Sequence, residues 1–587
     1  MNLLFDVEAD GLEPTKLYCI VIMDVDTKDV FTFDNTQLNE AYEMLGKATK
    51  LIGHNIIGYD IPAIEKIAGI KLSNIKAVDT LVLSRLFKPT REGGHGLENW
   101  GYRLGFKKGT YGKNEEAWDA YCPEMLEYCK RDVLLNFKVY NALRRESRGF
   151  SPTSVKIEHA VAKILDQQRT NGFVLDQRKA TMLIAMFQEK LFAVEEEVRE
   201  TFKPKETIRI LKPQYTKSGG LSKRAIDQEG MGTILSEDEY AKMLADNKPI
   251  KRVTCEEFNL GSRKQIGERL IAAGWKPKNY TPTGQPIVDE GTLTKVRGIP
   301  EASLIAKYLM LQKRLAQVNS WVKELNLDTG RVHGYVNPNG AVTSRMTHSH
   351  PNMAQIPSSN SPYGKECRSC WTVPSGYKLV GIDASGLELR MLAHYLDDEA
   401  YTNEILNGDI HTANQKLAGL ESRNQAKTFI YALLYGAGDA KLGSVAGRGR
   451  TAGKELRRSF FDNLPSFKNL TSKVQREAKT GFIKGLDGRK LMVRSEHAAL
   501  NTLLQGAGAI VMKQALITLN QMIQKLQLDA KFVANVHDEW QIECHERDAD
   551  QVGKLGVTAI IEAGKTLNLN CPLDGDYHVG NNWSETH

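Results

Sequence analysis

The sequence predicts a multidomain protein of mixed α/β and α+β class, and three observations carry this prediction. At about 100–200 residues per domain, a chain of 587 residues is expected to contain roughly three or four domains. Short β-branched runs at 2–8 and 17–25 are followed by helix-like stretches, and further strand patterns occur at 377–383 and 531–544. Hydrophobic residues make up 41% and charged residues 25%, which argues against widespread disorder.

Charge and targeting signals narrow the class of protein only slightly. The net charge of +7, from 78 basic and 71 acidic residues, permits a polyanionic partner without requiring one. The N-terminus MNLLFDVEAD lacks the basic region and long apolar core of a signal peptide, and we find no run of about 18 uncharged apolar residues. We therefore expect a cytosolic protein without a membrane partner.

Residues 1–150 are predicted to form a compact α/β unit. The runs NLLFDVE and LYCIVIMDV, separated by a Gly/Pro turn, indicate a hairpin. Helix-like stretches follow around 59–68, 79–87 and 121–145, and Gly-Phe-Ser-Pro at 149–152 marks a domain boundary.

The middle of the chain contains a helical segment followed by a segment rich in Pro, Gly and basic residues. From 155 to about 200 the pattern is helical, whereas 203–257 is interrupted by Pro and Gly. Within it, 203–224 has seven basic residues and one acidic residue. We expect an extended, mobile insertion rather than core. A basic flap along a phosphate backbone and a merely solvated loop both remain open.

Two carboxylates far apart in sequence are placed to meet on one sheet. Asp383 ends the strand in YKLVGIDASGLELR, and Asp538 lies at the turn of the predicted hairpin KFVANVHDEWQIEC. Such a pair can bind two Mg²⁺ ions about 3.5–4 Å apart. As alternatives, Asp538 serves only the turn, and Glu388 forms a capping box with Ser385.

A second acidic group is predicted near the N-terminus. Asp6 and Glu8 lie at the end of the first strand, GHNIIGYD supplies Asp60, and YCKRD places Tyr128 and Asp132 one helical turn apart. A D-x-E triplet alone is weak, but four carboxylates in one small domain repel each other unless divalent metal neutralises them. The interpretation is a two-metal nuclease in which Tyr128 orients the attacking water.

The stretch RNQAKTFIYALLYGAG predicts a helix that binds a ligand along one stripe. Arg423, Lys427, Tyr431 and Tyr435 are spaced four residues apart and therefore share a slowly drifting face. Two cations followed by two aromatic rings suit a molecule with phosphates at one end and a flat base at the other. The alternative is an ordinary surface helix.

Taken in order, these motifs resemble the family A DNA polymerases that carry a proofreading exonuclease, and among them the replicative enzymes of short-tailed bacteriophages. The motifs are DVEADGL, GHNIIGYD, YCKRD, VNPNGAVTSRMTHSHPNMAQIP, GIDASGLELR, RNQAKTFIYALLYGAG, HAALNTLLQ and VHDEWQ. They run from residue 6 to 541 and so cover almost the whole chain.

The resemblance implies a domain arrangement. An RNase H-like 3′→5′ exonuclease would occupy 1–150 and a right-hand polymerase 151–587. Its subdomains would be a thumb at about 190–330 containing the basic insertion 203–257, a palm at about 331–397 and 530–587, and fingers at about 398–529.

The resemblance also implies roles for named residues in DNA synthesis. Asp383 and Asp538 would hold two Mg²⁺ ions, for which Mn²⁺ can substitute. One ion would lower the pKa of the primer 3′-OH and the other would support the leaving pyrophosphate. The remaining roles are phosphate binding by Arg423, Lys427 and His411, contact with sugar and base by Tyr431 and Tyr435, exclusion of a 2′-OH by Glu388, and minor-groove contact by Arg345 and Gln505.

In the exonuclease, Asp6, Glu8, Asp60 and Asp132 would be the metal ligands. The implied partners are primer-template DNA, dNTPs, a phage helicase-primase and a single-strand DNA-binding protein, in the cytoplasm of an infected bacterium. Thioredoxin as a processivity factor stays open, because 203–257 cannot be matched residue by residue to the thumb insertion of the best-known relative. Two alternative functions are a single-subunit RNA polymerase and a catalytically silent DNA-binding accessory. Glu388 and the exonuclease motifs oppose the first, and the intact carboxylates oppose the second.

Overall fold

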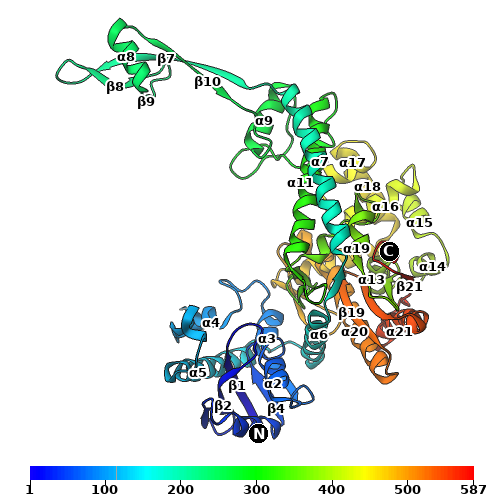
Figure 1. Ribbon diagram of the computed structural model, residues 1–587. Coiled ribbons are helices and arrows are strands. Elements are labelled where there is room, and N and C mark those ends of the chain that lie inside the picture. Colours follow the sequence, from blue (N-terminus) through cyan, green and yellow to red (C-terminus); the bar gives the residue numbers. More distant parts are fainter. Residues whose placement is uncertain (114) are drawn as a thin grey trace. The chain divides into compact units, whose positions relative to one another are not determined.

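The computed structural model describes residues 1–113 and 115–587 (Figure 1). The chain forms two compact units, of which the first comprises Met1–Gln177 and Lys323–His587 and the second Arg178–Val322. The second unit contains most of the segment predicted as thumb. The domain boundaries inside the first unit stay predictions.

A five-stranded sheet of order β3-β2-β1-β4-β5 forms the N-terminal part of the first unit. β1 pairs antiparallel with β2 and parallel with β4, so the predicted hairpin is confirmed and followed by parallel strands. The strands are β1 (Asn2–Ala9), β2 (Leu17–Asp24), β3 (Val30–Phe33), β4 (Lys50–Gly53) and β5 (Lys76–Asp79). The helices are α1 (Leu38–Gly46), α2 (Asp60–Ala68), α3 (Thr80–Phe87), α4 (Leu97–Leu104) and α5 (Pro123–Glu146).

Successive side chains of β1 point to opposite faces of the sheet, and each face packs against different helices. Leu3, Phe5 and Val7 join a core with α1 and α2, whereas Leu4 packs in a separate core with α5. Because strand side chains alternate, Asp6 and Glu8 lie on the same face as Leu4, toward α5.

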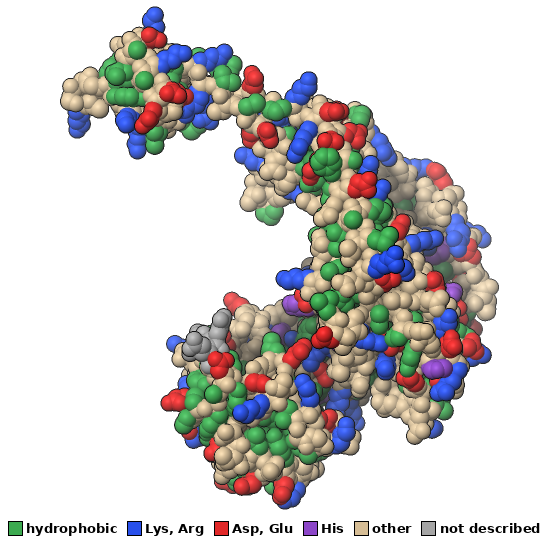
Figure 2. Space-filling view, viewed as in Figure 1, with side chains coloured by type: hydrophobic (Ala, Val, Ile, Leu, Met, Phe, Trp, Pro, Cys, Tyr) green, Lys and Arg blue, Asp and Glu red, His purple; other side chains and the backbone are tan. Residues whose placement is uncertain are grey.

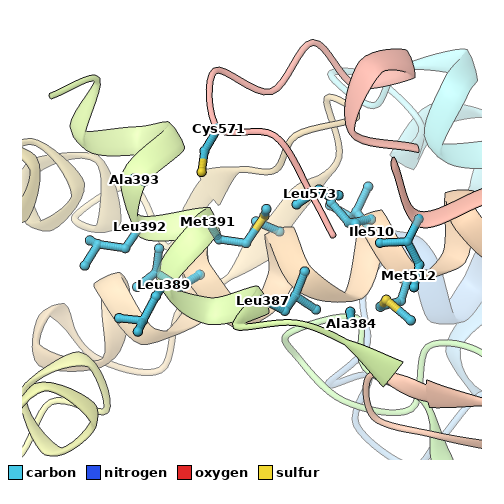
Figure 3. Close-up of a cluster of buried hydrophobic side chains, with 14 of the residues drawn as sticks. Ala384, Leu387, Leu389, Met391, Leu392, Ala393, Ile510, Met512, Cys571 and Leu573 are labelled. Atoms are coloured by element: carbon cyan, nitrogen blue, oxygen red, sulfur yellow. The ribbon is translucent and has the colours of Figure 1, made fainter. Parts of the chain in front are cut away.

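A four-stranded antiparallel sheet of order β19-β20-β16-β21 forms the centre of the C-terminal part. Helix α21 packs close to it, since a Cβ at Gly556 would lie only 2.3 Å from Ile382. Leu387 and Met391 of α13 and Ile510 and Met512 of α20 share one buried cluster (Figure 3). These elements are β16 (Tyr377–Ala384), β19 (Ala530–Val536), β20 (Glu539–His545), β21 (Gly575–Gly580), α13 (Leu387–Leu396), α20 (Ala499–Lys525) and α21 (Ala549–Thr566).

Smaller elements complete the first unit. The expected helical stretch from 155 to 200 is interrupted: α6 ends before Gly172, whose φ of +62° breaks the helix, and a short strand precedes α7. The strands are β6 (Phe173–Leu175), β11 (Leu325–Asn326), β12 (Arg331–Val332), β13 (Tyr335–Asn337), β14 (Thr347–Ser349), β15 (Trp371–Thr372), β17 (Phe482–Lys484) and β18 (Lys490–Met492). The helices are α6 (Pro152–Asn171), α12 (Gly364–Ser369), α14 (Glu399–Asn407), α15 (Ile410–Ala418), α16 (Arg423–Leu434), α17 (Asp439–Val445), α18 (Arg450–Asn463) and α19 (Pro465–Ala478).

Within the described part of the chain, one helix is long and apolar enough to span a bilayer by length and composition alone. It covers 496–525, and 72% of its most apolar window is buried inside the protein. That burial is typical of a core helix.

The second unit corrects the expectation of a mobile insertion at 203–257. This segment contains a four-stranded sheet of order β10-β7-β8-β9, and Leu211, Ala225, Leu235, Met243 and Ile250 form a small core beneath α8. We call this segment the sheet subdomain. The unit consists of α7 (Gln177–Thr201), β7 (Lys205–Tyr215), β8 (Leu221–Ile226), β9 (Gly232–Ile234), α8 (Glu237–Asp246), β10 (Ile250–Glu256), α9 (Arg263–Ala272), α10 (Glu290–Leu293) and α11 (Pro300–Lys323).

Candidate active site

The two carboxylates predicted for the C-terminal sheet are brought together by strand pairing. Asp383 is opposite Glu539 in the β16–β20 ladder, and the Ala384 N–H donates to the Asp538 carbonyl at 3.2 Å. Burial and the charges of Asp538 and Glu539 raise the pKa of Asp383 to about 7. Burial and the charge of Glu388 likewise raise the pKa of Asp538. The fold therefore concentrates negative charge here, and a divalent cation with oxygen ligands would relieve it.

The position of Asp538 depends on a buried network around its neighbour Glu539. Glu539 accepts hydrogen bonds from Trp583 Nε1 at 2.5 Å and from Gln541 Nε2 at 2.6 Å. His587 Nδ1 lies 3.1 Å from its other carboxylate oxygen. The C-terminal residues thus brace the hairpin that presents Asp538. The sequence reasoning missed this support because it joins residues more than 40 positions apart.

Glu388 is held by two of the predicted substrate-binding residues. Its Oε1 lies 3.2 Å from Arg345 Nη2 and accepts a hydrogen bond from the Tyr435 hydroxyl at 3.2 Å. The alternative of a capping box with Ser385 is wrong, because Gly386 at φ +59° caps α13 and no side chain bonds to the N-terminus of that helix. The Glu388 carboxylate instead faces the site.

Helix α16 begins at Arg423, as its sequence predicts, with a capping box between Ser422 and Gln425. It ends at Leu434, before Gly436 at φ +74°. The rings of Tyr431 and Tyr435 stack with centroids 6.5 Å apart. These two tyrosines therefore present adjacent aromatic faces, as predicted.

The predicted phosphate-binding cations gather at the start of α16. Burial and the nearby charges of Arg423 and Lys427 lower the pKa of His411, whose ring lies 6.4 Å from that of Tyr431. Arg423 also has a partner that the sequence did not suggest: its Nε lies 2.6 Å from Asp409 Oδ2. Both side chains of this pair are about half exposed, so a phosphate can compete for the guanidinium.

Gln505 completes the predicted set from the long helix α20. It lies one turn before Gly508, and Gly508 lines a pocket together with Arg345, His537 and Asp538. Among the described residues, the Gln505 side chain makes no hydrogen bond to Arg345, His537 or Asp538.

The four carboxylates predicted in the N-terminal domain also converge. Asp6 and Glu8 extend from β1, Asp60 begins α2, and Asp132 lies on α5. Asp60 Oδ1 accepts a hydrogen bond from the Val7 N–H at 3.2 Å, which joins α2 to β1. Burial and the charges of Asp60 and Asp132 raise the pKa of Asp6 well above its usual range.

Burial affects the other members of this group in the same way. It raises the pKa of Asp60 to about 7 and, together with the charge of Asp6, raises the pKa of Glu8. The buried Asp132 Oδ1 has no hydrogen-bond partner within the described part of the chain. The Cys129 thiol also lies within 4.8 Å of ligand atoms of Asp6 and Glu8, but burial raises the pKa of Cys129 well above its usual value, so the thiol stays protonated. The carboxylate oxygens that remain, one of them unpartnered, fit Mg²⁺ or Mn²⁺.

Tyr128 lies one turn before Asp132 and packs against Tyr111 and Trp118. Burial raises the pKa of Tyr128 to about 12, so its hydroxyl stays protonated at neutral pH. Such a hydroxyl can orient a water molecule by a hydrogen bond but cannot act as a general base.

Lys108 is a neighbour of this acidic group that sequence reasoning missed. Its Nζ lies 2.8 Å from Asp132 Oδ2 and 4.9 Å from the centroid of the Tyr128 ring. Asp132 raises the pKa of Lys108 despite its partial burial. No local pattern in FKKGTYG distinguishes Lys108 from Lys107, because the contact is tertiary.

The antiparallel sheet with Asp383 near the end of β16 and Asp538 in the turn before β20, together with helix α16 that carries Lys427 and Tyr431, has the architecture of right-hand nucleotide polymerases, preceded by an RNase H-like domain. Comparison with known proteins agrees: the sequence profile "DNA polymerase family A" matches residues 234–585, more than half of the chain. The chain belongs to DNA polymerase family A.

Relatives of the whole chain are phage proteins. The chain is 35% identical to the DNA-directed DNA polymerase of Enterobacteria phage T3, with 100% of both chains covered, and 35% identical to that of Escherichia phage T7, with 99% of both covered. Among solved structures, the polymerase domain of Pol1 from M. smegmatis, in complex with DNA primer-template and dNTP, superposes with a TM-score of 0.78. That match covers 100% of this chain and 95% of the other at 18% identity, and so shows the shared fold alone.

Proposed function

We propose that this protein synthesises DNA from dNTPs on a primed template by two-metal phosphoryl transfer, and that it replicates a phage genome in the cytoplasm of an infected bacterium. The observation that carries the proposal is the pairing of β16 with β20, which sets Asp383 beside the Asp538–Glu539 turn. Full-length similarity to phage DNA polymerases supports the same function. Mg²⁺ at these carboxylates would activate the primer 3′-OH and stabilise charge on the triphosphate.

The residues of the chain bind and orient the nucleotide. Lys427, Arg423 and His411 would bind the triphosphate, while Tyr431 and Tyr435 would contact sugar and base. Glu388, fixed by Arg345 and Tyr435, would occupy the space of a ribose 2′-OH. Arg345 and Gln505 would donate to minor-groove acceptors shared by all correct pairs.

Primer extension with Mg²⁺ and a labelled primer tests this proposal. We expect extension by the wild-type protein and none by Asp383→Asn. Asp328→Asn is the matched control, because Asp328 is an exposed carboxylate in the turn between β11 and β12. If the wild-type protein binds primer-template but never extends it, the protein is a silent DNA-binding accessory.

We further propose that the N-terminal domain removes mispaired nucleotides by 3′→5′ hydrolysis. The convergence of Asp6, Glu8, Asp60 and Asp132 supports this, together with a protonated Tyr128 to orient water. Degradation of a 3′-labelled single-stranded oligonucleotide measures it. Double replacement of Asp6 and Glu8 by Ala should abolish degradation and leave extension intact.

The sheet subdomain is our candidate surface for a processivity partner such as host thioredoxin. On the sheet face opposite α8, strand pairing places Ile208 beside Val253 and Ile210 beside Lys251, and all four side chains are exposed. Figure 2 shows hydrophobic and basic side chains together on the surface of this subdomain. Such a face suits a protein with an apolar surface and acidic rim. The length of DNA synthesised from a primer on a long template, with and without thioredoxin, tests this proposal. Binding of a helicase-primase and of a single-strand DNA-binding protein needs separate assays.

A further inference from the structure

The loop 105–110, between α4 and the helical turn Tyr111–Lys113, is held firmly against α5. Arg131 Nε donates to the Lys107 carbonyl at 2.7 Å. A Cβ at Gly109 would lie 2.9 Å from the Tyr128 ring, and one at Gly112 would lie 3.0 Å from the Tyr128 hydroxyl. Both glycines therefore allow a close approach of the backbone that follows Lys108, while the Arg131 bond to the Lys107 carbonyl fixes the backbone that precedes it.

This fixed backbone directs the Lys108 ammonium into the acidic group. Nζ binds Asp132 Oδ2 at 2.8 Å, and the two side chains are 27% and 3% exposed. Asp132 Oδ1 is buried and stays unpartnered among the described residues. One oxygen of this carboxylate is thus occupied by lysine, while the other is available to a metal ion.

From this geometry we propose that Lys108 is a positioning residue of the exonuclease: it orients the Asp132 carboxylate so that Oδ1 faces the metal site, and it offsets the repulsion among the four carboxylates before metal binds. The inference rests on the proposed exonuclease function and names a residue beyond its metal ligands and Tyr128. Charged partners of metal-binding carboxylates fix ligand orientation, and their loss commonly costs about 10–100-fold in metal affinity or activity.

The test compares Lys108→Met, which keeps length but loses charge, with Lys108→Arg, which keeps charge and donors. Lys107→Met is the matched control, because the Lys107 side chain is exposed and only its carbonyl is bound. With Mg²⁺, we expect Lys108→Met to lower kcat for single-strand degradation by roughly 10–100-fold with little change in KM. We expect Lys108→Arg to retain most of the rate and Lys107→Met to retain all of it.

A thermal readout is independent of catalysis. In EDTA, Lys108→Met should lower the melting temperature relative to wild type, because the carboxylates lose their resident cation, and Mg²⁺ should narrow the difference. Primer extension by Lys108→Met should equal wild type, which shows that the chain is folded. If that variant extends primers poorly, Lys108→Gln replaces it in the same comparison.

The outcomes separate the two proposals. If Lys108→Met degrades DNA and melts in EDTA like Lys107→Met, the positioning role is wrong while the exonuclease assignment stands. If Asp6→Ala/Glu8→Ala still degrades DNA, the exonuclease site itself is misplaced. In that case the EDTA melting comparison alone decides whether Lys108 compensates the carboxylates.

Discussion

The four carboxylates of the N-terminal domain and the two carboxylates of the C-terminal sheet differ in their charged neighbours. In the N-terminal domain, four carboxylates come from β1, α2 and α5, and Glu8, Asp60 and Asp132 are at most 8% exposed. Lys108 compensates part of their charge. In the C-terminal sheet, Asp383 lies on β16 and Asp538 in the turn before β20, and Arg345, a basic side chain near Asp538, is bound to Glu388.

If both groups bind metal ions, as proposed above, this difference implies two ways of using them. The acidic group of the N-terminal domain is assembled by tertiary contacts between β1, α2 and α5, and we expect its charge to make the proposed exonuclease site depend strongly on cations. The group of Asp383 and Asp538 is built by one ladder of backbone hydrogen bonds, and its proposed substrate contacts come from α16 and Glu388. We therefore expect the first site to respond mainly to metal and pH, and the second mainly to nucleotide structure.

The largest expected effect is that a variant of either acidic group loses one of the two activities and keeps the other. Asp383→Asn should reduce extension by more than ~10³-fold and leave degradation unchanged, since a metal ligand contributes several kcal/mol to charge stabilisation. Asp6→Ala/Glu8→Ala should do the reverse. Parallel extension and degradation assays on both variants measure this, and loss of both activities in either variant would break the distinction between the sites.

The next effect is a dependence of stability on pH and metal. Asp60 and Asp383 each have a pKa of about 7, above the unfolded value of 3.8, so between pH 4 and 7 the folded protein binds protons that the unfolded chain has released. Stability in EDTA should therefore fall as pH rises through this window, and Mg²⁺ should restore it at pH 8.

Denaturant unfolding at pH 5.5 and pH 8, with EDTA or Mg²⁺, checks this dependence. Asp6→Asn/Glu8→Gln should remove more of it than Asp383→Asn, because more of the buried charge lies in the N-terminal domain. An EDTA stability that rises from pH 5.5 to pH 8 would contradict the account of both sites.

Nucleotide selection should depend on the bulk of Glu388. Glu388→Ala should raise ribonucleotide incorporation by roughly 10–100-fold, since a steric contact at a sugar carbon discriminates on this scale. Glu388→Gln, which keeps the volume, is the control and should still exclude ribonucleotides. Competitive incorporation of rNTP and dNTP on one template gives the rNTP/dNTP incorporation ratio. Equal ratios for Glu388→Ala and Glu388→Gln would show that Glu388 does not exclude ribonucleotides by its bulk.

The smallest effect concerns the Tyr431 hydroxyl. If Tyr431 contacts the nucleotide sugar, as proposed above, its hydroxyl can fill the place of a missing nucleotide 3′-OH. Tyr431→Phe should lower the dideoxy/deoxy incorporation ratio by about tenfold, the value of one hydrogen bond of ~1.4 kcal/mol. Tyr435→Phe, on the neighbouring ring, should leave the ratio near wild type. An unchanged ratio in Tyr431→Phe would show that the ring is not at the sugar.

The strands and helices that carry the site were predictable from local pattern. Alternation placed Asp6 and Glu8 on one strand face, and a spacing of four placed Tyr128 and Asp132 on one helix face. Family resemblance then assigned roles, and the structure brings these residues together.

What local pattern missed depends on contacts between distant segments. Ser385-x-x-Glu388 fits a capping box, yet Arg345 and Tyr435 bind the carboxylate instead. The Pro- and Gly-rich segment 203–257 reads as a loop, but β7 and β10 pair across some forty residues and close a small core. Lys108 likewise depends on the packing of a loop against α5.

The most direct test of the account is a crystal structure of the protein with primer-template, a dNTP and Mn²⁺, in which anomalous scattering locates the ions. We predict two ions about 3.5–4 Å apart in the palm, with Asp383 and Asp538 both bound to the same pair, and triphosphate oxygens completing their coordination. Ions that contact only one of these carboxylates, or carboxylates too far apart to share a cation, would contradict the proposed chemistry.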